Sequence, residues 1–122
     1  MVSSHSLIAI VDDEEPIRRA LVRLLRSAGL SGIAYASADE FLSALPQLRC
    51  RCVVLDVHMP GTSGIELQQR LANLWPRLPV IMVTGQHSAQ AEAQVREHQP
   101  LAYLHKPLDA EQLLGAIRST AP

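Results

Sequence analysis

Several kinds of residue are scarce in this sequence, and each scarcity excludes a class of protein. The 122 residues include one Trp, one Phe and two Tyr, so we do not expect a surface that stacks nucleic-acid bases. The 11 basic and 12 acidic residues give a net charge of -1, which supplies neither a basic DNA-binding footprint nor a polybasic membrane patch. No apolar run approaches the roughly 20 residues that span a bilayer, and no signal-peptide pattern is present. These features predict a cytoplasmic protein that contacts neither nucleic acid nor membrane.

Cysteine is scarce as well, and its spacing argues against a structural role. One residue separates Cys50 from Cys52, so a disulfide between them would close a strained ring, while alternation along a strand places both on one face. No further ligands lie nearby to complete a metal site. We expect free thiols in a reducing compartment. The histidines share no metal-ligand spacing, and we expect all of them at the surface: His5, His58, His87, His98 and His105.

The residues that are abundant predict one folded α/β domain over residues 1–122. Hydrophobic residues make up 48% of the chain, which is enough for a substantial core. Apolar, strand-like runs occupy residues 6–11, 31–36, 51–56, 79–83 and 101–105. Helix-compatible segments follow at 17–28, 37–45, 63–74, 88–98 and after Asp109. This alternation favours a doubly wound parallel sheet of five strands with helices on both faces.

The expected helices differ in how much apolar surface they carry. In the third, Leu67, Leu71 and Leu74 form an inward stripe at helical spacing. The segment 88–98 is poorer, with only Ala89, Ala93 and Val95, so we expect it to be held loosely. We interpret the arginines of the first helix as a solvated face.

Polar residues follow four of the five apolar runs. Asp12 and Asp13 end the first, Asp56 the third, Thr84 the fourth and Lys106 the fifth. The carboxyl ends of parallel strands share one edge of the sheet, where ligands bind in open α/β folds. Three carboxylates in one shallow site repel each other unless a cation joins them, and Mg²⁺ suits such oxygen ligands best. Lysine and threonine could then donate to phosphoryl oxygens.

Four segments together resemble the receiver domain of bacterial two-component response regulators. They are VDDEEPIRRAL, LDVHMPGTSG, the VTG that ends at Gly85, and LHKPLD around Lys106, and the likeness covers nearly the whole chain. These segments are most similar to those of regulators with a helix-turn-helix output domain. The resemblance implies a flavodoxin-like fold with strand order 2-1-3-4-5.

The resemblance also implies roles for individual residues. Asp56 would accept a phosphoryl group, and it would share Mg²⁺ with Asp13 directly and with Asp12 through water. The backbone carbonyl of His58 would complete the metal ligands.

Further residues would respond to the phosphoryl group. Thr84 and Lys106 would contact the phosphoryl oxygens, and Tyr103 would act with Thr84 as a switch. The Lys106-Pro107 bond would be cis.

As a member of this family the chain would be a switch rather than an enzyme with a foreign substrate. A sensor histidine kinase would be its partner, and it would catalyse only its own phosphorylation and dephosphorylation. A homodimer would form through the face of segments 88–98, 101–105 and the final helix. The turn at residues 97–100 lacks a glycine that is frequent in the family.

Two alternatives stay open at this level. The same fold occurs in flavodoxin-like cofactor modules, but these need a Ser/Thr/Gly-rich phosphate loop where this chain has Asp12-Asp13-Glu14-Glu15. A receiver-like module that works without phosphorylation usually lacks one of the acidic or lysine residues, and all are present here. Asp12 and Asp13 could also be helix-start residues.

Overall fold

Strand and helix alternate along the chain as the sequence predicts. The computed structural model describes residues 7–85, 89–97 and 100–120. The strands are β1 (Leu7–Val11), β2 (Ser31–Tyr35), β3 (Cys52–Asp56), β4 (Val80–Thr84) and β5 (Ala102–His105). The helices are α1 (Glu15–Ser27), α2 (Ala38–Ala44), α3 (Gly64–Leu74), α4 (Ala89–Glu97) and α5 (Ala110–Arg118), with a short 3-10 helix η1 (Leu45–Gln47). The expected ends at Ser6, Ser88 and His98 lie outside the described residues.

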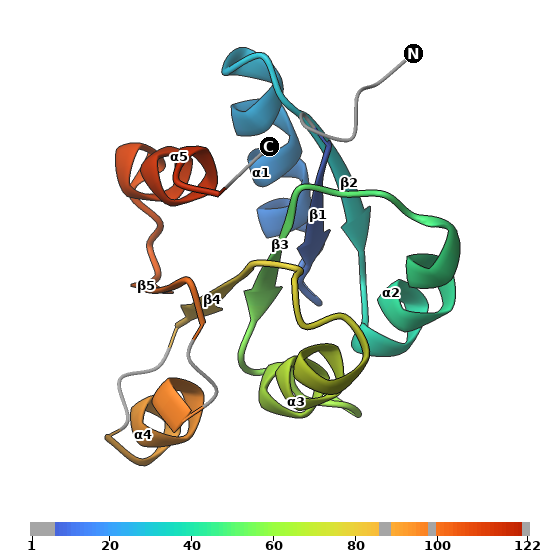
Figure 1. The fold of residues 1–122 in the computed structure, drawn as a ribbon. Helices are drawn as coiled ribbons and strands as arrows, with labels where there is room; N and C mark the ends of the chain where they lie inside the picture. The colour runs from blue at the N-terminus through green and yellow to red at the C-terminus, as the bar shows by residue number, and fades with distance from the viewer. Residues whose placement is uncertain (1–6, 86–88, 98–99, 121–122) are drawn as a thin grey trace.

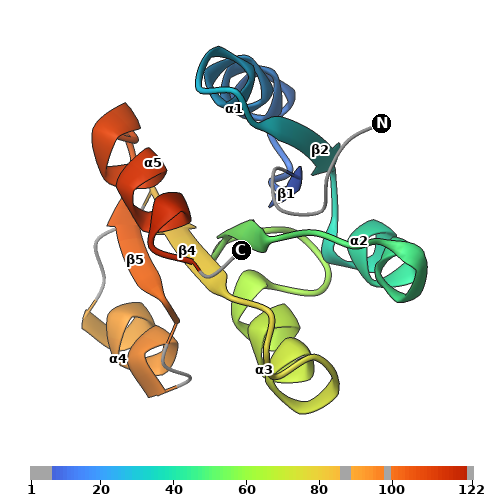
Figure 2. The same ribbon diagram turned by 45° about the horizontal axis from the view of Figure 1, so that its top comes forward.

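The strands form one parallel sheet in the order β2-β1-β3-β4-β5, which confirms the predicted flavodoxin-like, doubly wound fold. Helices α1 and α5 cover one face, and α2, α3 and α4 cover the other (Figures 1 and 2). Each face has its own apolar cluster: Phe41 and Leu67 are buried on the α2–α4 side, and Leu25 and Ile117 on the α1–α5 side. Because the central strands are covered on both faces, nearly all of their side chains are apolar.

The helix boundaries follow from local capping. The hydroxyl of Ser37 accepts a hydrogen bond from the backbone N–H of Glu40 at 3.1 Å, and Ser63 does the same for Glu66 at 3.1 Å. Both residues begin helical segments that the sequence predicts, 37–45 and 63–74. Gly29 ends the first helical segment with a φ of 79°, a conformation that residues with a Cβ rarely adopt.

Three sequence expectations about the helices need correction. Leu74 is 63% exposed, because it is the last residue of α3 and lies at the rim of a surface hollow rather than over the sheet. The second helix ends at Ala44, one residue earlier than predicted, and the chain continues into η1, which contains Pro46. In α4, Ala89 and Ala93 are exposed, and among the described side chains of this helix only Val95 is buried.

The cysteines are free thiols, as expected, but they do not share a face. Strand β3 begins at Cys52, which packs on the α1–α5 side, whereas Cys50 precedes the strand and packs on the other side. Burial raises the pKa of Cys50 to about 11 and that of Cys52 to about 12, so neither is a thiolate at neutral pH. Across the described helices, none has the length and apolar character needed to cross a bilayer.

Candidate functional site

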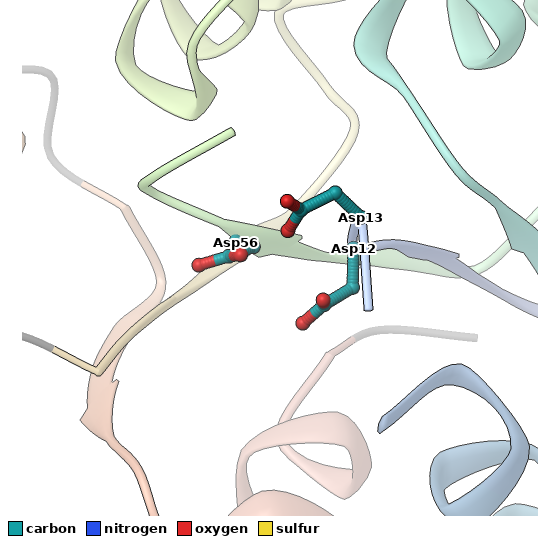
Figure 3. Close-up of side chains that lie close together, drawn as sticks. All are labelled: Asp12, Asp13 and Asp56. Carbon is teal, nitrogen blue, oxygen red and sulfur yellow. The ribbon is translucent and has the colours of Figure 1, made fainter. Parts of the chain in front are cut away.

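Strand register brings the predicted acidic residues together. Val11 of β1 pairs with Leu55 of β3, so Asp12 and Asp56, the next residues, emerge side by side at the carboxyl edge. Asp13 follows Asp12, and the three carboxylates lie close together in Figure 3. One oxygen from each lies within 4.8 Å of the other two. The cluster thus unites residues separated by more than forty positions in the sequence.

Asp12 and Asp56 are almost fully buried, with 4% exposure each, whereas Asp13 is exposed. Backbone N–H groups hold the buried carboxylates in place: Glu14 donates to Oδ1 of Asp12 at 2.9 Å, and His58 donates to Oδ1 of Asp56 at 3.3 Å. Each bond spans two residues, so the turn after the strand fixes the orientation of its own terminal carboxylate.

Lys106, directly after β5, reaches across the sheet edge into the same cluster. Its Nζ lies 3.1 Å from Oδ2 of Asp12, 3.6 Å from Oδ2 of Asp56 and 3.6 Å from Oε1 of Glu14. Burial lowers the pKa of Lys106, but the hydrogen bond to Asp12 and the nearby carboxylates outweigh it and raise the pKa. Lys106 is therefore a firmly charged counter-ion. The Lys106-Pro107 bond is cis, as the resemblance implied.

One ammonium group does not neutralise this many carboxylates. Burial and the charge of Asp12 raise the pKa of Asp56 from 3.8 to about 6, although Lys106 and the His58 N–H oppose the rise. Near neutral pH the site therefore holds an excess of negative charge in a poorly solvated position. Such a site favours a ligand that brings positive charge.

The donor set fits a magnesium ion. Mg²⁺ takes oxygen ligands at about 2.0–2.1 Å, so oxygens bound to one ion lie at most about 4.2 Å apart. The carboxylate oxygens of Asp12, Asp13 and Asp56 are within 4.8 Å of each other, so small side-chain shifts would bring them into range. Two details of this site stay predictions. They are the binding of Asp12 to the metal through water and the participation of the His58 carbonyl.

The other predicted residues also lie at this edge. Thr84 is the last residue of β4 and is fully buried, and its carbonyl accepts a hydrogen bond from the N–H of Lys106 at 2.7 Å. Tyr103 is half-buried; burial raises the pKa of its phenol, and its interaction with the Thr84 side chain opposes the rise. The two side chains are thus neighbours, and their joint role as a switch stays a prediction.

The prediction of five surface histidines is wrong for His58. Its side chain is half-buried, and its Nε2 atom is buried without a hydrogen-bond partner among the described residues. His58 follows the strand within two residues of Asp56, where the backbone still runs close to the core. His105 is exposed as expected, and His5, His87 and His98 lie outside the described residues.

Two residues that support the site were not predicted from the sequence. Arg18 is half-buried, and its Nη1 donates to the carbonyl of Asp12 at 2.8 Å, so it is not simply part of a solvated helix face. At Gly64, a Cβ atom would overlap the carbonyl oxygen of Asp56. The first could have been suspected from its position in the opening turns of the helix after Asp12. The second depends on how closely two backbone segments approach, which no local pattern reveals.

Comparison with known proteins points in one direction. A family model described as the response regulator receiver domain matches residues 8–118. The chain is 38% identical over 119 residues to the response regulator protein TmoT of Ectopseudomonas mendocina, covering 98% of this chain and 54% of that protein. It is 35% identical to the transcriptional regulatory protein FixJ of Bradyrhizobium diazoefficiens, covering 92% of this chain and 55% of the relative.

A solved structure has the same architecture. A response regulator receiver protein from Pseudomonas putida superposes with a TM-score of 0.89 at 27% identity, covering 96% of this chain and 98% of that one. The chain spans about half the length of the curated relatives named above.

Proposed function

This chain belongs to the response regulator receiver domain family, and from that premise we propose that Asp56 is a phosphoacceptor for a sensor histidine kinase. The observation that carries the proposal is the convergence of Asp12, Asp13, Asp56 and Lys106 at one sheet edge. We further propose that residues 1–122 form one receiver domain.

In the proposed reaction, a carboxylate oxygen of Asp56 attacks the phosphorus of a phosphohistidine in line with the bond that breaks. A new oxygen–phosphorus bond forms and gives an acyl phosphate. The phosphorus–nitrogen bond breaks, and the released imidazole takes a proton from water. Phosphoryl transfer depends mainly on positioning and on neutralising charge at the equatorial oxygens. The N–H of His58, 3.3 Å from Oδ1, leaves the other carboxylate oxygen of Asp56 available as the nucleophile.

The remaining residues supply charge and hydrogen bonds around the phosphoryl group. Lys106 already lies 3.6 Å from Oδ2 of Asp56, so a modest movement would pair it with a phosphoryl oxygen. Asp12 and Asp13 would hold Mg²⁺, which supplies positive charge to the transferred group when bound. The buried Thr84 hydroxyl, at the end of the neighbouring strand, would donate to another oxygen.

Phosphorylation would then change the conformation by altering charge at this edge. An aspartyl phosphate adds negative charge, which would draw Lys106 away from Asp12 and towards the phosphoryl group. The side chain of Thr84 would also move towards the phosphoryl group. Helix α4 follows Thr84 and has Val95 as its one buried residue among the described side chains, so we expect it to change position most easily. The switch would involve Tyr103, and the face of α4, β5 and α5 would form the homodimer.

The output of the switch is proposed from relatives. TmoT is named a response regulator and FixJ a transcriptional regulatory protein, and each is about twice the matched length. We propose that this domain belongs to a longer regulator that controls transcription. The rival flavodoxin-like cofactor function is disfavoured, because a buried Asp12 and an adjacent Glu14 would repel a cofactor phosphate at the end of β1.

The test uses acetyl phosphate as a small phosphoryl donor. The protein is incubated with acetyl phosphate and Mg²⁺, and its intact mass is measured. We expect a labile gain of one phosphoryl group that is lost in Asp56→Asn and in the presence of a chelator, but kept in the matched variant Asp39→Asn, which is exposed. An equal gain in Asp56→Asn would refute the assignment.

A further inference from the structure

The amino ends of the strands carry two adjoining hollows, at the opposite end of the sheet from the acidic cluster. The larger has a volume of about 570 Å³ and the smaller about 260 Å³. They share the connection from α3 to β4, residues 75–79, which is yellow in Figure 1. The larger extends to the segment before β3 and the smaller to the segment before β5. We call these two hollows together the amino-end trough.

The trough has apolar walls and exposed apolar rims. Leu48, Trp75 and Leu78 line it and are half-buried. Leu74 at 63% and Leu101 at 45% are the large hydrophobic residues that the described part of the chain exposes. Leu74 borders the larger hollow and Leu101 the smaller. Exposed apolar side chains gathered on one surface are typical of an interaction site.

The charge of the trough has a single sign. Arg49, Arg51 and Arg77 line the larger hollow, and among the residues that the structure describes no acidic one lines either hollow. Arg51 is engaged with the last described residue, since its Nε donates to Oγ1 of Thr120 at 2.6 Å. Arg49 and Arg77 are exposed and make no ion pair or hydrogen bond with other described residues. In a protein of net charge -1, this is a local concentration of positive charge.

We propose that the amino-end trough binds a polypeptide segment that carries carboxylates beside large apolar side chains. Its carboxylates pair with Arg49 and Arg77, and its apolar side chains cover Leu74, Trp75 and Leu101. The extent of the trough favours a polypeptide, because a compact small anion would fill one hollow and leave the other open. Arginine pairs with carboxylates in a bidentate geometry, which gives the contact direction as well as strength. The proposal is independent of phosphorylation at Asp56.

A built-in reporter makes the proposal testable. Trp75 is the single tryptophan of the chain and lines both hollows, so its fluorescence reports occupation directly. The probe is a synthetic peptide of Glu, Leu and Ser, titrated into the full chain at low salt. Two matched peptides replace every Glu with Lys or every Leu with Ala.

We expect the acidic peptide to shift Trp75 emission to shorter wavelength and to saturate, and both control peptides to leave it unchanged. Arg49→Gln combined with Arg77→Gln should raise the Kd about tenfold, which matches the loss of two partly exposed ion pairs. Leu74→Ser should weaken binding as well. The matched pair Arg23→Gln and Arg26→Gln, on exposed positions of α1, should leave the Kd unchanged.

Several outcomes overturn the proposal. Saturable binding of the Lys peptide would show that the positive charge of the trough is not recognised. The same conclusion would follow if the α1 control variant lost as much affinity for the acidic peptide as the variant of Arg49 and Arg77. If the acidic peptide fails to bind while anilinonaphthalene sulfonate saturates the site, the site takes small organic anions instead. If the protein self-associates in sedimentation velocity and Leu74→Ser abolishes this, the occupant is a second copy of the chain.

Discussion

Replacing Asp56 with Asn should stabilise the protein in the absence of metal ions. The carboxylate has 4% exposure, and one ammonium group 3.6 Å away is shared with Asp12 and Glu14. Burial and the charge of Asp12 raise its pKa from 3.8 to about 6, so the folded state holds this ionised group at a cost that the unfolded chain does not bear. Asn has nearly the same shape and removes that charge.

The size and pH dependence follow from the two pKa values. Because the folded pKa is higher, ionisation destabilises the fold, an effect that is absent below 3.8 and complete above about 6. The full difference corresponds to about 3 kcal/mol, and screening by solvent makes this an upper figure, so we expect about 1–3 kcal/mol at pH 8. At pH 5 the folded state is largely protonated, and about half of the effect should remain.

Urea unfolding followed by Trp75 fluorescence, with a chelator present, measures this difference. Asp56→Asn should unfold at a higher urea concentration than the parent at pH 8, with the gap narrowing at pH 5. The exposed Asp39→Asn, as the matched control, should stay within about 0.5 kcal/mol at both pH values. A less stable Asp56→Asn at pH 8, or a gap that widens on acidification, would contradict the electrostatic reasoning.

Three further substitutions test other contacts of the fold. Lys106→Met removes the counter-ion of Asp56, so NMR titration of labelled aspartates should find the pKa of Asp56 above about 6; an unchanged or lower value would contradict its role. Gly64→Ala forces a Cβ against the carbonyl oxygen of Asp56 and should lower the unfolding free energy by at least about 2 kcal/mol, whereas Gly115→Ala, with open space around it, should not destabilise. Arg51→Met breaks side-chain hydrogen bonds to the last described turn and should speed amide exchange there, at a cost of about 1–2 kcal/mol; unchanged exchange would show that these bonds do not hold the turn.

Much of the fold was predictable from the alternation of strands and helices, and much of the site from the residues at the strand ends. Alternating apolar runs and helical stripes predict a parallel sheet, and in such a sheet all carboxyl ends share an edge. Asp12, Asp56, Thr84 and Lys106 are each tied to the end of their own strand, so their convergence requires no knowledge of side-chain packing.

The details that were wrong or missed depend on distances between elements. Helical periodicity assigns Leu74 to the apolar stripe of α3, but Leu74 is the last residue of the helix and lies beyond the part that packs on the sheet. Cys50 and Cys52 fall on opposite sides because the strand begins only at Cys52. Arg18 reaches the carbonyl of Asp12 because the turn between β1 and α1 is short. The positions of Leu74 and the two cysteines do not follow from residue type or spacing alone, whereas the place of Arg18 in the opening turns of the helix was a clue to its contact.

If Asp56 carries the phosphoryl group, a chemical label will locate the modification at this residue. After reaction with acetyl phosphate and Mg²⁺, borohydride reduction converts an aspartyl phosphate to homoserine, and tandem mass spectrometry locates the product. We predict homoserine at position 56 and at no other aspartate, including the neighbouring Asp12 and Asp13. Homoserine at a different position, or none in a protein whose intact mass has risen, would contradict it.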